Sequence, residues 1–152
     1  MKTTKFAFYL NKFFTVYLPN TNGSTPATID SYRYAFILFL NFMEEKGVGA
    51  DKIDIPDITR NLVIDYLKWL QDRRGNSIAT RNQRQAAVNS FINYLVYEFP
   101  EYMSEYQRIL NIPIKKAPQK DITYLKTDEV KILINQVDVD NKNGLRDYVI
   151  LY

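Results

Sequence analysis

The sequence predicts an all-α fold in which four to five helices pack as a small bundle. Apolar residues recur at steps of three and four along most of the 152-residue chain, the spacing of one helix face. Hydroxyl residues and proline stand where these stripes begin, and glycine stands where two of them end. The β-branched residues follow helical rather than alternating patterns, so strand signals are weak. With 46% hydrophobic residues, the chain can fill one ordinary core and is too apolar to be intrinsically disordered.

The first two predicted helices carry stripes that are rich in aromatic residues. The first helix covers residues 5–18 and ends at Pro19. In the second, Thr25 supplies a cap hydroxyl and Pro26 takes the first position, where its missing N–H costs nothing. This helix ends at Gly47, just after a lysine that suits the last turn. The apolar residues of the two stripes are Phe6, Tyr9, Leu10, Phe13, Phe14, Tyr17 and Leu18, and Ile29, Tyr32, Ala35, Phe36, Phe39, Leu40 and Met43.

The third and fourth predicted helices follow the same pattern of caps. Thr59 can cap the third helix, which two arginines and Gly75 close. Ser77 caps the fourth helix, which runs to about Phe99, where Pro100 interrupts it. The core positions of these helices are Leu62, Val63, Tyr66, Leu67 and Leu70, and Val88, Phe91, Ile92, Leu95 and Phe99.

The character of the chain changes after the fourth helix. Residues 101–110 fit one short helix, whereas the prolines within residues 112–118 exclude a regular helix and favour an extended linker. A further helix begins at Thr127, a polar turn covers residues 138–143, and another apolar element starts at Gly144. The apolar face of the helix after the linker carries Val130, Leu133, Ile134 and Val137.

These elements predict two domains joined by a linker. We expect a complete helical domain over residues 1–104, a basic linker over residues 105–123, and the beginning of a second domain over residues 124–152. The last apolar element has no cap or stop signal, so we expect this second domain to be truncated.

Composition excludes the commonest kinds of active site. The chain has no cysteine, which rules out disulfides and thiolate metal sites, and no histidine, the commonest general base and metal ligand. No glycine-rich phosphate loop, metal-ligand spacing or pair of carboxylates stands out. We therefore expect no catalytic residue, no metal and no cofactor. A secretory signal and an apolar window of about 20 residues are also missing, so we expect a soluble, cytoplasmic protein without membrane contact.

Charge is distributed unevenly along the chain. The 20 basic and 17 acidic residues give a net charge of only +3. Residues 73–97, however, hold four arginines and no acid, and residues 106–120 hold one arginine, three lysines and no acid. Two such windows suggest a side of the protein that faces a polyanion. An unevenly charged but merely solvated surface fits the windows equally well.

The fourth predicted helix combines an apolar stripe with basic and polar residues at its start. On a helical wheel, Arg81, Arg84 and Gln85 lie on the same side as Val88 and Ile92, so the apolar stripe becomes basic and polar in the first turns. We expect this end to extend beyond the core and to meet an anion, which the free N–H groups of a helix start also favour. Neighbouring side chains able to donate to phosphates or base edges are Ser77, Thr80, Asn82 and Gln83. A frayed, solvated helix end is the alternative.

The order of these features resembles the N-terminal part of tyrosine recombinases, the phage-integrase and Xer-like family. The stretches that carry the resemblance are TPATIDSY (25–32), FLNF (39–42), IT (58–59), VIDYL (63–67), SIATRN (77–82), FINY (91–94), NIP (111–113), YLKTDEV (124–130) and LRDYVIL (145–151). Each motif is loose, but their order and spacing are fairly specific and run along the whole chain.

The resemblance implies a SAM-like core-binding domain, one half of a clamp on duplex DNA, followed by the start of a catalytic domain. In that family the second and fourth helices meet the major groove, and lysines of the linker can follow the phosphate backbone. Other recombinase protomers are implied as partners. The candidate DNA-binding residues are Thr28, Tyr32, Arg33, Ser77, Thr80, Arg81, Arg84, Gln85, Lys115, Lys116 and Lys120.

No residue of this chain matches the catalytic arginines, lysine, histidines or nucleophilic tyrosine of the family, and Arg146 and Tyr152 do not take their places. We therefore expect a DNA-binding fragment without catalysis, whose parent, a housekeeping recombinase or a mobile-element integrase, cuts and rejoins DNA through a phosphotyrosine. The alternative is a helical protein-interaction module that docks through the stripe of residues 6–18. An unrelated helix-turn-helix regulator would need a recognition helix that the sequence does not place.

Overall fold

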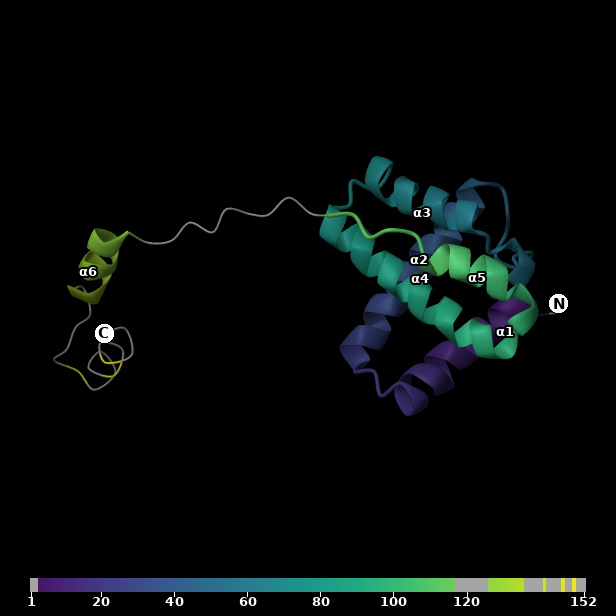
Figure 1. Ribbon diagram of the computed structural model, residues 1–152, viewed down its shortest axis with the longest axis horizontal. Helices are drawn as coiled ribbons and strands as arrows, with labels where there is room; N and C mark the ends of the chain where they lie inside the picture. Colours follow the sequence, from purple (N-terminus) through teal and green to yellow (C-terminus); the bar gives the residue numbers. More distant parts are fainter. Residues whose placement is uncertain (1–2, 117–125, 136–140, 142–145, 147–148, 150–152) are drawn as a thin grey trace. The chain divides into compact units, whose positions relative to one another are not determined.

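The computed structural model describes residues 3–116, 126–135, 141, 146 and 149. Every regular element in these ranges is a helix, which confirms the predicted all-α class (Figure 1). The chain divides into a compact unit over residues 1–117 and a second unit over residues 118–152. The elements are α1 (Lys5–Lys12), η1 (Phe13–Thr21), α2 (Pro26–Glu45), η2 (Ile55–Asp57), α3 (Arg60–Asp72), α4 (Ile78–Glu98), η3 (Pro100–Tyr102), α5 (Met103–Leu110) and α6 (Thr127–Asn135).

Hydrogen bonds of the cap residues confirm the predicted starts of α2, α3 and α4. The side-chain oxygen of Thr25 accepts from the backbone N–H of the third residue of α2 at 3.3 Å, and Thr59 and Ser77 do the same for α3 and α4 at 3.2 Å each. Gly47 and Gly75 follow α2 and α3 with φ of +80° and +63°, the left-handed conformation that closes a helix and that glycine adopts without strain.

The first helical segment extends further than expected. The prediction that it ends at Pro19 is wrong, because α1 passes directly into η1, a π-helix that contains Pro19 and reaches Thr21. Proline removes only one hydrogen bond near a helix end, and the neighbouring Leu18 is fully buried, so packing holds the segment in place. The wide helix closes when the Asn22 N–H donates to the Tyr17 oxygen at 2.9 Å, and the chain then turns at a left-handed Gly23.

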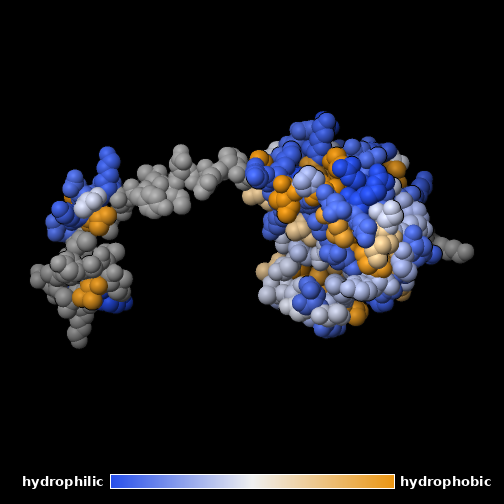
Figure 2. All heavy atoms as spheres, in the orientation of Figure 1, coloured by the Kyte–Doolittle hydropathy of each residue, from blue (hydrophilic) through white to orange (hydrophobic). Residues whose placement is uncertain are grey.

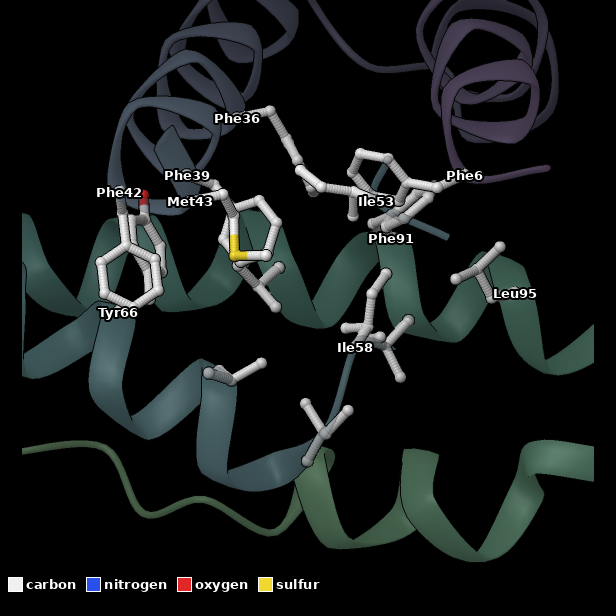
Figure 3. Packing of buried hydrophobic residues seen from close by; sticks show 14 of the residues in the cluster. Phe6, Phe36, Phe39, Phe42, Met43, Ile53, Ile58, Tyr66, Phe91 and Leu95 are labelled. Carbon is white, nitrogen blue, oxygen red and sulfur yellow. The ribbon is translucent and has the colours of Figure 1, made fainter. Parts of the chain in front are cut away.

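Aromatic rings fill the centre of the first unit. Phe91 of α4 is only 1% exposed, and its ring lies 5.9 Å from Phe6, 5.2 Å from Phe13 and 5.2 Å from Phe36, measured between centroids. All three contacts are edge-to-face, an arrangement favoured by the ring quadrupoles. Figure 3 shows Phe6, Phe36 and Phe91 converging from α1, α2 and α4. One ring of α4 thus joins three helical segments.

The helix α5 belongs to this core, which extends the first unit beyond the boundary expected at residue 104. Tyr106 and Ile109 are at most 1% exposed, and Ile112 is 5% exposed. The carboxylate of Glu105 also accepts a hydrogen bond from the Arg60 N–H at 2.6 Å, at the start of α3. The compact unit consequently runs to residue 117, because the short helix supplies apolar faces that α3 and α4 need.

The second unit contains α6, which begins at Thr127 as the sequence predicts. Asp128 and Glu129 occupy its first turn, where acidic groups suit the helix dipole. The remainder of the linker with Lys120, the position of Val137, most of the polar turn and most of the last apolar element lie outside the described residues. Within the described ranges, no helix has both the length and the apolar character that crossing a bilayer demands.

A buried tyrosine provides a test of the packing between α2 and α3. The Tyr66 hydroxyl donates to the Ala35 backbone oxygen at 2.7 Å, and burial raises the pKa of this hydroxyl, an effect that the Arg84 charge partly opposes. We expect Tyr66→Phe to lower the free energy of unfolding by about 1–2 kcal/mol, because a buried hydrogen bond is lost. Tyr106→Phe is the matched control, since that buried hydroxyl has no hydrogen-bond partner in the described part of the chain. Guanidinium unfolding should leave the Tyr106 variant within about 0.5 kcal/mol of the parent.

Candidate nucleic-acid interface

The N-terminal halves of α2 and α4 lie against each other, joined by polar contacts. The Gln83 amide donates to the Ser31 hydroxyl at 3.1 Å, and Arg84 Nη1 donates to the Ser31 backbone oxygen at 3.1 Å. The Arg84 guanidinium also lies 5.0 Å from the centre of the Tyr34 ring, within cation–π range. The structure therefore brings Arg84, one of the candidate residues of the fourth predicted helix, next to α2. Ser31 and Tyr34 were not among the candidates, although Ser31 lies in the TPATIDSY stretch.

The candidates on α2 have different surroundings. Thr28 is partly buried and its hydroxyl lies 3.0 Å from the hydroxyl of the cap residue Thr25. Tyr32 packs against the core. Arg33 is exposed, pairs with Asp30 at 3.1 Å and lies 5.7 Å from the Phe14 ring of η1. Arg33 therefore contacts η1 rather than α4, and it is not grouped with Arg84.

The start of α4 does not extend beyond the core, contrary to expectation. Arg81 is 6% exposed and Gln85 is 1% exposed. Arg81 Nη1 donates to the oxygens of Gln85 and Asn82, and the Gln85 amide donates to the Ile112 backbone oxygen at 2.7 Å. Residues 112–116 lie against this part of α4 and bury its side chains. A helical wheel could not predict their burial, because residues 112–116 come from a distant part of the sequence.

These residues, here named the 112–116 segment, run back from α5 along α4 (Figure 1). Asn82 holds the backbone of Lys115 from both sides: its amide donates to the Lys115 oxygen at 2.7 Å, and its oxygen accepts from the Lys115 N–H at 3.3 Å. The Lys115 ammonium donates to the side-chain oxygen of Gln71 on α3. Lys116 is exposed. The candidate lysines are thus placed beside the arginines of α4, whereas Lys120 lies outside the described residues.

An amide-lined hollow of about 330 Å³ lies between η1, α4 and the 112–116 segment. Its polar lining includes Asn22 of the turn after η1 and Asn82, Asn89 and Asn93 of α4, and none of the described residues that line it is charged. Amide groups of this kind can donate to and accept from base edges. The sequence interpretation missed Asn89 and Asn93, although their spacing from Asn82 by seven and eleven residues places all three on one helix face.

The first turns of α4 offer further hydrogen-bonding groups. Ser77 is exposed, and its hydroxyl lies 3.0 Å from the Thr80 hydroxyl. Burial lowers the pKa of Arg81 from its usual value, but a guanidinium in a protein keeps its charge. In the described residues, the buried Nε atoms of both Arg81 and Arg84 lack a hydrogen-bond partner. The arrangement can bind anions and base edges. Across the same residues, no group of three acidic side chains could hold a metal ion.

Comparison with known proteins gives a consistent family. Residues 11–98 match the phage integrase N-terminal SAM-like domain. The chain is 32% identical over 151 residues to a protein of Sinorhizobium fredii named as an integrase/recombinase (y4rC), covering 99% of this chain and 46% of that protein. It is 28% identical over 165 residues to tyrosine recombinase XerC of Caldanaerobacter subterraneus, with 99% and 45% covered.

A third relative comes from a mobile element. Transposase A from transposon Tn554 of Staphylococcus aureus is 31% identical over 108 residues, with 68% of this chain and 28% of that protein covered. No solved structure matches the chain. The chain spans about half the length of the integrase/recombinase and XerC relatives. Because the domain match covers more than half of its residues, the chain belongs to the phage integrase and tyrosine recombinase family, through its N-terminal SAM-like domain.

Proposed function

We propose that the chain binds duplex DNA as the core-binding part of a tyrosine recombinase. The observation that carries the proposal is the contact of Arg84 and Gln83 with Ser31, which joins the starts of α2 and α4 into one polar, cationic surface. Family membership supports the same conclusion. The DNA-facing surface is formed by the N-terminal halves of α2 and α4 together with the 112–116 segment.

The physical basis for DNA binding is a concentration of hydrogen-bond donors and cations, of which Arg84 and Lys116 form no ion pair among the described residues. Ser31 lies in the second turn of α2 and Arg84 in the second turn of α4, so both helix starts lie near the same place. Free N–H groups and the positive ends of the helix dipoles attract phosphate there. Lys116 adds an exposed charge, and polar side chains such as Gln83 can reach base edges.

The chemistry of the whole protein is a separate part of the proposal. Cutting and rejoining DNA through a phosphotyrosine belongs to the catalytic domain, of which residues 124–152 form the beginning. The chain described here contributes binding, because it has no histidine and no match to the catalytic residues of the family. Other protomers on the same DNA complete the assembly.

Removing two surface charges tests the DNA-binding surface. In the 152-residue chain, we expect Arg84→Gln combined with Lys116→Gln to weaken binding to a mixed-sequence duplex. The slope of log affinity against log salt should fall by about 1.8, since each lost phosphate contact removes about 0.9. Fluorescence anisotropy at about 50 to 200 mM salt measures both quantities.

The matched control removes two charges elsewhere. Lys5 lies 5.7 Å from the ring of Phe99, at the opposite end of α4 from Arg84, and Lys52 is exposed in the loop before η2. Lys5→Gln combined with Lys52→Gln should keep the parent slope. Equal slopes for the two double variants would contradict the assignment of the surface.

The alternative of a protein-interaction module receives little support from the packing. Of the stripe that was expected to dock, Phe6, Phe13 and Leu18 are at most 1% exposed and belong to the core of the same chain. If the unsubstituted 152-residue chain bound no duplex at low salt, that result would favour a protein partner instead.

A further inference from the structure

A cavity of about 300 Å³ lies between α3, the first turns of α4 and the 112–116 segment. Three cationic residues line it, one from each of these parts: Lys68, Arg81 and Lys115. Asp72 is the acidic residue of the lining, so positive charge is in excess. Hydrophilic residues predominate on the α3 side of the first unit in the view of Figure 2.

Arg81 is the unusual member of this group, because its side chain is buried and forms no ion pair with the residues that the structure describes. The residue is 6% exposed, and its hydrogen bonds go from Nη1 to the neutral amides of Asn82 and Gln85. Its Nε is buried without a partner among the described residues, and no carboxylate pairs with it there. A buried charge normally carries a compensating charge, so an anion bound beside Arg81 would be favourable.

The two lysines of the lining are both exposed. The Lys115 ammonium donates to the neutral side-chain oxygen of Gln71, and the Lys115 backbone is held in place by Asn82. Lys68 is exposed on α3 and forms no ion pair within the described ranges. Two ammonium groups and a buried guanidinium that line one cavity form a site for a compact, multiply hydrogen-bonding anion.

We propose that this cavity binds one phosphate group of the DNA backbone, an inference that rests on the proposed DNA-binding function. It adds Lys68 and the α3 side to a surface otherwise built from α2, α4 and the 112–116 segment. A phosphate has oxygens for the guanidinium and for both ammonium groups, and its negative charge compensates the excess positive charge of the lining. A free phosphate or a mononucleotide has the same chemistry, so the test separates these sources.

Lys68→Gln in the full chain tests the site without disturbing the buried Arg81. We expect the slope of log duplex affinity against log salt to fall by about 0.9, the value of one phosphate contact. Lys68→Arg should restore the slope, because it keeps the charge. Lys52→Gln is the matched control, an exposed lysine outside the surface that should keep the parent slope.

The outcomes separate this inference from the proposed function. If Lys68→Gln binds like the parent while Arg84→Gln with Lys116→Gln still loses slope, DNA binding stands and the cavity is not part of it. If the unsubstituted 152-residue chain showed no salt-sensitive binding, both the proposed function and this inference would be overturned.

Inorganic phosphate and a mononucleotide are titrated separately while backbone amide resonances of residues 68, 71, 81 and 115 are followed by NMR. Saturable shifts together with an unchanged Lys68→Gln slope would assign the cavity to a free phosphate and reject the backbone phosphate.

Discussion

Phe91→Ala is expected to lower the free energy of unfolding by about 3–5 kcal/mol, the usual loss when a buried phenylalanine leaves a cavity. The Phe91 ring contacts the rings of Phe6, Phe13 and Phe36, so its removal weakens the packing of α1, η1 and α2 at once. Because these rings come from three separate segments, the surrounding structure can close the cavity only partly. Chemical denaturation followed by far-ultraviolet circular dichroism measures the change.

Phe8→Ala is the matched control for this variant. Phe8 lies on α1 like Phe6, but 56% of it is exposed, so truncation should change the unfolding free energy by no more than about 0.5 kcal/mol. A loss below about 1 kcal/mol for Phe91→Ala would contradict the central position of this ring.

Alkaline pH is expected to destabilise the domain steeply. Burial, reinforced by the Glu98 carboxylate, raises the pKa of Tyr94 to about 12, and burial raises the pKa of Tyr66 and Tyr106 as well. In the unfolded chain a tyrosine loses its proton near pH 10, so above that pH the unfolded state binds fewer protons than the native state. The free energy of unfolding should then fall by up to about 1.4 kcal/mol per pH unit for each of these tyrosines, and it should be insensitive to them below about pH 9.

Unfolding curves between about pH 8 and pH 11 measure this slope. Lysines titrate in the same range, so the share of a single tyrosine comes from comparing the parent with Tyr106→Phe, which should have a shallower slope. Absorbance at about 295 nm reports ionisation of the phenol groups. Ionisation of all the tyrosines near pH 10 in a chain that stays folded would show that these hydroxyls are not buried.

Much of the fold follows from local sequence. Thr25, Thr59 and Ser77 cap their helices as predicted, because a cap depends on a side chain and a backbone N–H only three residues away. The apolar stripes of α2, α3 and α4 face the core for a similar reason: a helix places residues three and four apart on one side. The exception is Pro19, where burial of the adjacent Leu18 outweighs the local preference to end the helix.

Only part of the candidate site could be predicted from the local sequence. The acid-free, arginine-bearing start of α4 is visible in the sequence, and so are the lysines of the linker. That Arg84 meets Ser31, and that Asn82 holds the backbone of Lys115, depends on segments 53 and 33 residues apart. Periodicity carries no information about such pairs.

The sequence by itself determined the helical class, the helix starts, the stripes that form the core and the family motifs, because each is encoded within a few neighbouring residues. Only the tertiary structure decided the surroundings of the charges at the start of α4. The path of the chain after α5 covers Arg81 and Gln85, which were expected to extend beyond the core, and it brings Lys115 and Lys68 to the same cavity. The physical reason is that burial and electrostatic environment depend on which distant segment lies against a side chain, and the fold of the whole unit sets that contact.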